Sequence, residues 1–222
     1  ALIINVAIQK TTFKYEIPYM LLITAVLLVM GMTGNEITFI EGVILWILFI
    51  AYLLYLYILA KKGNDSGDEQ SVKLYPVWKC LLFIVLGGVC VVIGSQFVVN
   101  GATTIARACG MSERFIGLTI VAFGTSLPER VTSVSAARKG NAGIAIGNIV
   151  GSNIFNILFV VGTVALICPV PFESRFVIDT VVAILCGVLL WGGTIRHKEL
   201  RKPCGVVMLL CYAAYFVYLA AM

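Results

Sequence analysis

The sequence predicts an all-α integral membrane protein with about seven transmembrane helices. Of its 222 residues, 60% are hydrophobic and only 12% are charged, and the mean hydropathy is +1.02. A soluble domain of this size would be about a quarter charged. The apolar runs are long and lack the alternation of barrel strands, so we expect the membrane spans to be helical.

Seven segments of the chain are apolar and long enough to cross a bilayer as helices. They comprise residues 17–34, 38–60, 79–106, 113–138, 141–167, 175–193 and 204–221. A polar stretch, KKGNDSGDEQSVK at 61–73, separates the second segment from the third. The segments 113–138 and 141–167 contain glycines and polar residues at membrane depth, so we expect these two helices to be discontinuous.

The basic residues are distributed unevenly between the two sides of the membrane. Arg107, Arg114 and Arg175 fall on one side, and Arg130 lies within a predicted helix. The other twelve fall on the opposite side: Lys10, Lys14, Lys61, Lys62, Lys73, Lys79, Arg138, Lys139, Arg196, Lys198, Arg201 and Lys202. Because Lys and Arg concentrate in cytoplasmic loops, we expect a multi-pass protein of the inner (plasma) membrane, with residue 1 and the 61–78 loop in the cytoplasm and the C-terminus outside. The net charge of +5 thus reports topology in the lipid bilayer, and nucleic acid is not an expected partner.

The chain contains an internal repeat. The segment GVILWILFIAYLLYL at 42–56 matches GVVMLLCYAAYFVYL at 205–219 with six identities, and Ala1-Leu2-Ile3 recurs as Ala165-Leu166-Ile167. The first two predicted helices are therefore earlier copies of the last two, and one period holds five helices. Because five is odd, the second copy crosses the membrane upside down, as in the inverted repeats of secondary transporters.

The repeat predicts three parts of the chain. Residues 1–60 are the last two helices of a first repeat, 61–78 form a cytoplasmic loop, and 79–222 form a complete second repeat of five helices. The first copies of the third to fifth helices would precede residue 1, so we expect a fragment that lacks roughly 85 N-terminal residues. The alternative is a natural half-protein that pairs with a second chain.

The segment GLTIVAFGTSLPER at 117–130 begins as an apolar run and then becomes polar. Pro128 cannot donate a backbone hydrogen bond, so we expect the helix to break just before it and to free carbonyls such as that of Phe123. Thr125, Ser126 and Glu129 are spaced to converge on one face. These hard oxygen ligands and their one negative charge are suited to Na⁺ or Ca²⁺.

The segment GNIVGSNIFN at 147–156 has a similar polar interruption. Ser152 and Asn156 are four residues apart and share one helix face, so they are candidate cation ligands. Asn148 and Asn153 point elsewhere, and we expect them to cap or bridge broken helix ends. The glycines of this segment are also typical of close packing between membrane helices.

The motifs GTSLPE and GNIVGSNIFNIL together resemble the second α-repeat of the cation/calcium antiporter superfamily, the sodium/calcium exchangers, and most closely the bacterial ones. The resemblance covers nearly all of the 222 residues and implies a ten-helix fold of two inverted five-helix halves. It implies that the transported Ca²⁺ and Na⁺ are bound, with no cofactor, by Thr125, Ser126, Glu129, Ser152 and Asn156. Asn153, Asn148 and Phe123 are further candidates, and the other half would supply an equivalent glutamate.

The chain departs from this family pattern at two positions. Asn156 stands where some members carry Asp, which removes one charge from the site, and Arg130 stands where Leu or Ile is commoner. The implied mechanism is Na⁺/Ca²⁺ antiport by alternating access, in which both ions compete for one set of oxygens.

The sequence leaves alternatives to this mechanism. One is a proton/calcium antiporter of the same fold, in which Glu129 titrates. Another is a half-transporter that is inactive without its partner half. A membrane hydrolase is disfavoured, because the one histidine, His197, lies in a basic loop and no GxSxG motif accompanies Ser126.

Overall fold

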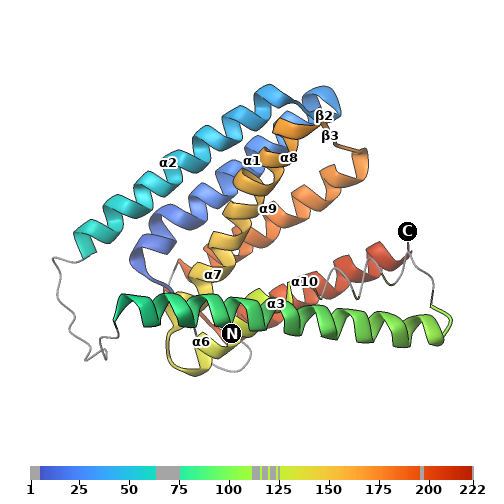
Figure 1. Ribbon diagram of the computed structural model, residues 1–222. Helices are drawn as coiled ribbons and strands as arrows, with labels where there is room; N and C mark the ends of the chain where they lie inside the picture. The colour runs from blue at the N-terminus through green and yellow to red at the C-terminus, as the bar shows by residue number, and fades with distance from the viewer. Residues whose placement is uncertain are drawn as a thin grey trace.

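The computed structural model describes residues 6–63, 76–111, 116, 120, 124, 126–195 and 198–221, and within them the chain is almost entirely helical (Figure 1). The helices are α1 (Ile17–Gly34), α2 (Phe39–Gly63), α3 (Val77–Ala108), α6 (Leu127–Arg138), α7 (Ala142–Phe155), α8 (Gly162–Ile167), α9 (Ser174–Thr194) and α10 (Lys202–Ala221). Two π-helical segments, η1 (Thr12–Glu16) and η3 (Asn156–Val161), precede α1 and join α7 to α8.

Six of the seven predicted segments agree closely with described helices, whereas most of the first half of the segment 113–138 lies outside the described residues. Five of the described spans are long and apolar enough to cross a membrane, namely Thr12–Gly34, Phe39–Lys61, Val77–Ala108, Gly143–Ile167 and Phe176–Thr194, and Lys202–Tyr218 forms a shorter apolar helix. The last helix begins slightly before its predicted start, at Lys202, because Pro203 is tolerated in a first turn. The protein is therefore a multi-pass membrane protein.

The two helices expected to be discontinuous are irregular in different ways. Of the segment 113–138, α6 begins only at Leu127, and the upstream residues that are described, Ile116, Ile120 and Gly124, have helical backbone. The segment 141–167 is not broken as predicted: it is helical from Ala142 to Ile167, because its glycines and asparagines, unlike Pro128, keep their backbone N–H donors. Its hydrogen-bond pattern changes from α to π at Asn156 and returns to α at Gly162.

The core lies between the helices of the upper bundle in Figure 1, where α1 packs along α9 and α2 packs along α8 and η3. The largest fully buried side chains there include Ile17, Ile23, Leu45, Ile154 and Leu158. Apolar side chains elsewhere on the helices, and almost all of those on α3, face outward, as they do on lipid-facing surfaces.

Two short antiparallel ribbons join the two ends of α1 to the two ends of α9. Strand β1 (Val6–Ala7) pairs with β4 (Glu199–Leu200), and β2 (Glu36–Ile37) pairs with β3 (Val170–Pro171). β1 precedes α1 and β4 follows α9, so these two helices run antiparallel. The sequence analysis did not predict the ribbons.

The internal repeat makes β2 equivalent to β4 and β1 equivalent to β3. The two ribbons are built alike at these equivalent positions. The ribbons are extended by matching hydrogen bonds, Ile8 N–H to Lys198 O (2.9 Å) and Phe172 N–H to Asn35 O (2.7 Å). Asn35 and Lys198, which are also equivalent, are the two non-glycine residues of the described chain with positive φ, at 55° and 52°. In both places a left-handed residue follows a long helix and turns the chain into its ribbon.

Close packing of the buried Phe172 ring on Gly31 fixes the β2–β3 ribbon to the end of α1. A Cβ at Gly31 would overlap that ring, whereas a Cβ at Gly34, in the next turn, meets open space. We expect Gly31→Ala to lower the free energy of unfolding by about 1–3 kcal/mol through overpacking.

Gly34→Ala is the matched control and should leave stability unchanged or slightly raised. Thermal unfolding in detergent, followed by circular dichroism, measures both variants. Equal melting temperatures for Gly31→Ala and the wild type would contradict the packing described for Phe172.

Candidate ion-binding site

The N-terminus of α6 lies where the sequence predicted a break in the membrane helix. Ser126 occupies the N-cap position with φ −93° and ψ 4°, and Leu127 and Pro128 form the start of the first turn. Proline is tolerated there because the first N–H groups of a helix have no partner within it. These free N–H groups give the N-terminus a partial positive charge that attracts anions.

Glu129 lies in this first turn and carries a carboxylate oxygen that has no donor among the described residues. Its side chain is half-buried, and Oε2 is inaccessible to solvent with no hydrogen-bond partner among the described residues. The helix N-terminus offsets only about 0.3–1 kcal/mol of the cost of a negative charge in such a position. The local arrangement therefore favours an additional positive charge at Oε2.

Asn148 of α7 holds the first turns of α6 in place. Its Nδ2 amide lies within donating distance of Glu129 O (3.1 Å), Thr132 Oγ1 (3.1 Å) and Ser133 Oγ (3.0 Å). Thr132 Oγ1 in turn donates to Pro128 O (2.9 Å) or Glu129 O (3.1 Å). The sequence analysis assigned no role to Thr132 and Ser133, since small polar residues in a helix are as typical of packing as of a network.

The packing of α6 on α7 is that of a tight antiparallel hairpin. Gly140, with φ 80°, follows α6, and the bonds Gly140 N–H to Ala137 O and Asn141 N–H to Ala136 O close a Schellman motif. Because the two helices run antiparallel and Asn148 is level with Glu129, the next turn of α7 extends past the start of α6. That turn carries Ser152.

The prediction that Asn148 points elsewhere is wrong, because Asn148, Ser152 and Asn156 follow one another at intervals of four and lie along the same helix face. Ser152 is half-buried and its hydroxyl donates to Ile149 O (3.2 Å), which leaves its oxygen lone pairs free to bind a cation. Asn156 is exposed, and its amide makes no hydrogen bond within the described ranges. Asn153 points to a different side and donates to Ile149 O (2.9 Å).

The remaining predicted site residues are placed as follows. Thr125 and Phe123 lie outside the described residues. Ser126 is half-buried, and its side chain makes no capping hydrogen bond. Arg130 faces a hollow on α6 that it lines with five further residues, Val131, Val134, Ser135, Arg138 and Lys139.

The donor set around α6 and α7 consists of neutral oxygens and one carboxylate. In the part of the chain that the structure describes, no three His, Cys, Asp or Glu side chains group to hold a metal, and all seven cysteines are free. Oxygen donors of this kind bind hard cations such as Na⁺ and Ca²⁺ in preference to soft metals.

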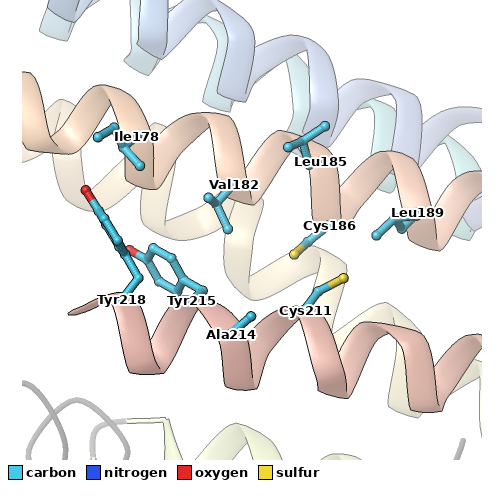
Figure 2. Close-up of a pocket in the computed structure, with 9 residues that line it drawn as sticks. All are labelled: Ile178, Val182, Leu185, Cys186, Leu189, Cys211, Ala214, Tyr215 and Tyr218. Carbon is cyan, nitrogen blue, oxygen red and sulfur yellow. The ribbon is translucent and has the colours of Figure 1, made fainter. Parts of the chain in front are cut away.

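A hollow between α9 and α10 differs from this site in its chemistry. It measures about 490 Å³, and Figure 2 shows the Cys186 and Cys211 sulfurs within it and Tyr215 and Tyr218 at one end. Tyr215 Oη donates to Asp179 Oδ1 (2.6 Å), so this carboxylate already has a partner. The lining is otherwise apolar and offers no set of ligands for an ion.

Comparison with known proteins agrees with these features. Residues 79–221 match the family described as sodium/calcium exchanger protein. The putative antiporter CaxA of Alkalimonas amylolytica is 33% identical over 225 residues, which cover 97% of this chain and 70% of that protein. The sodium/calcium exchanger MaX1 of Methanosarcina acetivorans is 37% identical over 142 residues, 64% of this chain and 41% of that protein.

A solved structure has the same fold. The sodium-calcium exchanger NCX_Mj, soaked with zero Na⁺ and Ca²⁺, superposes with a TM-score of 0.78 and 30% identity, covering 99% of this chain and 69% of that one. The match extends over all the helices described above, and the relatives are transporters. The chain therefore belongs to the sodium/calcium exchanger family, within the cation/calcium antiporter superfamily.

Proposed function

We propose that this member of a cation-exchanging family is a Na⁺/Ca²⁺ antiporter that works by alternating access, with Glu129 as the central ligand of the transported ions. The observation that carries the proposal is the buried Glu129 Oε2, for which the described residues provide no donor. An unpaired charge at membrane depth costs about 2.5–3.5 kcal/mol or more. A bound cation removes that cost, and its release restores it, so the site binds ions reversibly.

The other ligands proposed for the same ion are Ser126, Thr125, Ser152 and Asn156. Ser126 is adjacent to the first turn of α6, and Ser152 and Asn156 continue the face of α7 that contacts this turn through Asn148. Phe123 would contribute a backbone carbonyl. Since Na⁺ and Ca²⁺ use the same oxygens, binding of one excludes the other, which produces exchange instead of co-transport.

One carboxylate balances only half of the charge of Ca²⁺. We propose that a second glutamate comes from a first repeat, related to residues 79–222 by inversion and located outside this chain. Residues 1–60 would be the last two helices of that repeat, and 61–78 a cytoplasmic loop. In this arrangement the protein lies in the inner (plasma) membrane, with residue 1 in the cytoplasm and the C-terminus outside.

Several pairs of equivalent positions support the inverted repeat. The two ribbons correspond to each other, and they require α1 and α9 to cross the membrane in opposite directions. A tyrosine near a carboxylate also occurs twice: Tyr215 donates to Asp179, and its equivalent, Tyr52, lies near Glu16, the equivalent of Asp179. The neighbouring pairs Tyr52–Tyr55 and Tyr215–Tyr218 stack at similar angles, 25° and 27°.

Calcium uptake into vesicles that contain the full-length protein tests the proposed function. We expect an outward Na⁺ gradient to drive uptake and Glu129→Gln to reduce it by more than roughly 10-fold, since each 1.4 kcal/mol of lost binding energy is tenfold in affinity. Glu36→Gln is the matched control, because Glu36 is exposed in the β2 ribbon, and it should behave as wild type.

Three outcomes would go against the proposal. Uptake driven by a pH gradient and indifferent to Na⁺ would identify a proton/calcium antiporter. Na⁺-driven uptake that survives Glu129→Gln would remove Glu129 from the site. Uptake by the present chain on its own, at the full-length rate, would show that no second half is needed.

The network of Asn148 provides a separate prediction. Asn148→Ala removes the amide that joins Glu129 O, Thr132 and Ser133, so the first turn of α6 loses its fixed position. We expect the apparent affinity for Ca²⁺ to fall roughly 10-fold, corresponding to about 1.5 kcal/mol from lost hydrogen bonds.

Titration of uptake rate against Ca²⁺ concentration measures the effect. Thr180→Val on α9 is the control, because the Thr180 hydroxyl donates only to Phe176 O of its own helix. An Asn148→Ala variant with unchanged Ca²⁺ affinity would exclude a positioning role for Asn148.

A further inference from the structure

The π-helix η3 begins on a proposed ion ligand. It comprises the six residues Asn156–Val161 within the membrane span Gly143–Ile167. A π-helix closes each hydrogen bond over one residue more than an α-helix, i→i+5 instead of i→i+4, and is rare. The residues at both of its ends have right-handed helical dihedral angles, so no proline or left-handed residue causes the change.

Aromatic side chains of α2 pack against this segment. Phe155 and Phe159 stack across the start of the π-helix, with ring centroids 4.7 Å apart at 24°. Trp46 lies 5.2 Å from Phe159, and the buried Phe49 lies 5.9 Å from Phe155 and 5.4 Å from Phe159. The four rings therefore form one cluster between α2 and η3.

A relay of hydrogen bonds connects α2 to the far end of the same π-helix. Trp46 Nε1–H donates to Thr163 Oγ1 at 3.2 Å, across 117 residues of sequence. The Thr163 hydroxyl donates in turn to Phe159 O at 2.5 Å, and Gly162 N–H donates to that same carbonyl. Trp46 thus holds both the ring and, through Thr163, the backbone of Phe159.

Two glycines allow α2 to approach closely enough for these contacts. A Cβ at Gly162 would lie 3.2 Å from Leu45 Cβ and 3.3 Å from Trp46 Cδ1. A Cβ at Gly42 would lie 2.9 Å from Ala165 Cβ and 3.1 Å from Gly162 O. The two backbones are therefore in contact, which fixes α8 against α2.

The span 143–167 is consequently anchored at two places. Its first half is attached to α6 by Asn148, and its second half is attached to α2 by Trp46 and the glycine contacts. The π-helix η3 lies between the two anchors. Asn156 stands at this junction, so the direction of its amide depends on the π turn.

We propose that Trp46 is a positioning residue for ion binding: through Phe159 and Thr163 it stabilises the π-helix that orients Asn156 toward the ions. This inference rests on the proposed role of Asn156 as a ligand. The position equivalent to Trp46 in the second repeat is Leu209, which has no donor.

The test is equilibrium Ca²⁺ binding to the purified full-length protein, together with the concentration dependence and maximal rate of Na⁺-driven uptake. Trp46→Phe keeps an aromatic ring but removes the N–H donor, and Thr163→Val removes the relay hydroxyl. We expect each to weaken Ca²⁺ binding roughly 3- to 10-fold, as for the loss of one partly buried hydrogen bond. Maximal rate and melting temperature should change little. The double variant should be no weaker than either single one, because both interrupt one relay.

Trp191→Phe is the matched control. Trp191 lies in α9, and its buried Nε1 has no acceptor among the described residues, so the same substitution removes no hydrogen bond there and should leave Ca²⁺ affinity unchanged.

The inference is overturned if Trp46→Phe and Thr163→Val bind Ca²⁺ as the wild type does, if their effects add, or if they lower only maximal rate or stability. If Trp46→Phe does not fold, Thr163→Val decides alone. Should Glu129→Gln retain Na⁺-driven uptake, the proposed function fails independently of these variants.

Discussion

The buried carboxylate oxygen of Glu129 is the constraint on which the rest of the site depends. At the start of α6 it lies near the partial positive charge of the helix N-terminus, but the described part of the chain provides no hydrogen-bond donor to it. Proline at 128 both starts the helix there and leaves its first N–H groups free. We propose that a bound cation completes this group, and the neutral oxygens nearby suit a hard cation.

The scaffold fixes this site through contacts far from it. Two equivalent ribbons hold the ends of α1 and α9, and α2 packs without an intervening layer on α8 through Gly42 and Gly162. The α6–α7 hairpin is attached to this frame through the single span 143–167, whose π turn lies beside the polar face of α7. A rigid frame with one irregular span allows ligands to be positioned without breaking the helix.

The fold class and the helices follow from sequence because membrane thickness sets the length of an apolar run. The start of a helix beside Pro128, with Glu129 in its first turn, was also predictable, because proline is tolerated only in the first turn of a helix, whereas the ion-binding role of Glu129 stays a prediction. The ribbons could not be predicted, because two-residue strands carry no periodic pattern and the residue type of Lys198 gives no sign of a left-handed turn. The π-helix was missed as well, since NILFVV at 156–161 is an ordinary apolar helix in sequence, and its cause, Trp46, is far away along the chain.

The central claim is that Glu129 Oε2 binds the transported cation. Anomalous diffraction from crystals of the full-length protein soaked in Sr²⁺, as a substitute for Ca²⁺, tests it most directly. The account predicts a peak adjacent to Glu129 Oε2, at about the 2.3–2.6 Å typical of Ca²⁺–oxygen bonds, that disappears as Na⁺ is raised. A protein donor within hydrogen-bonding distance of Oε2, with no cation peak in Na⁺-free crystals, would contradict it.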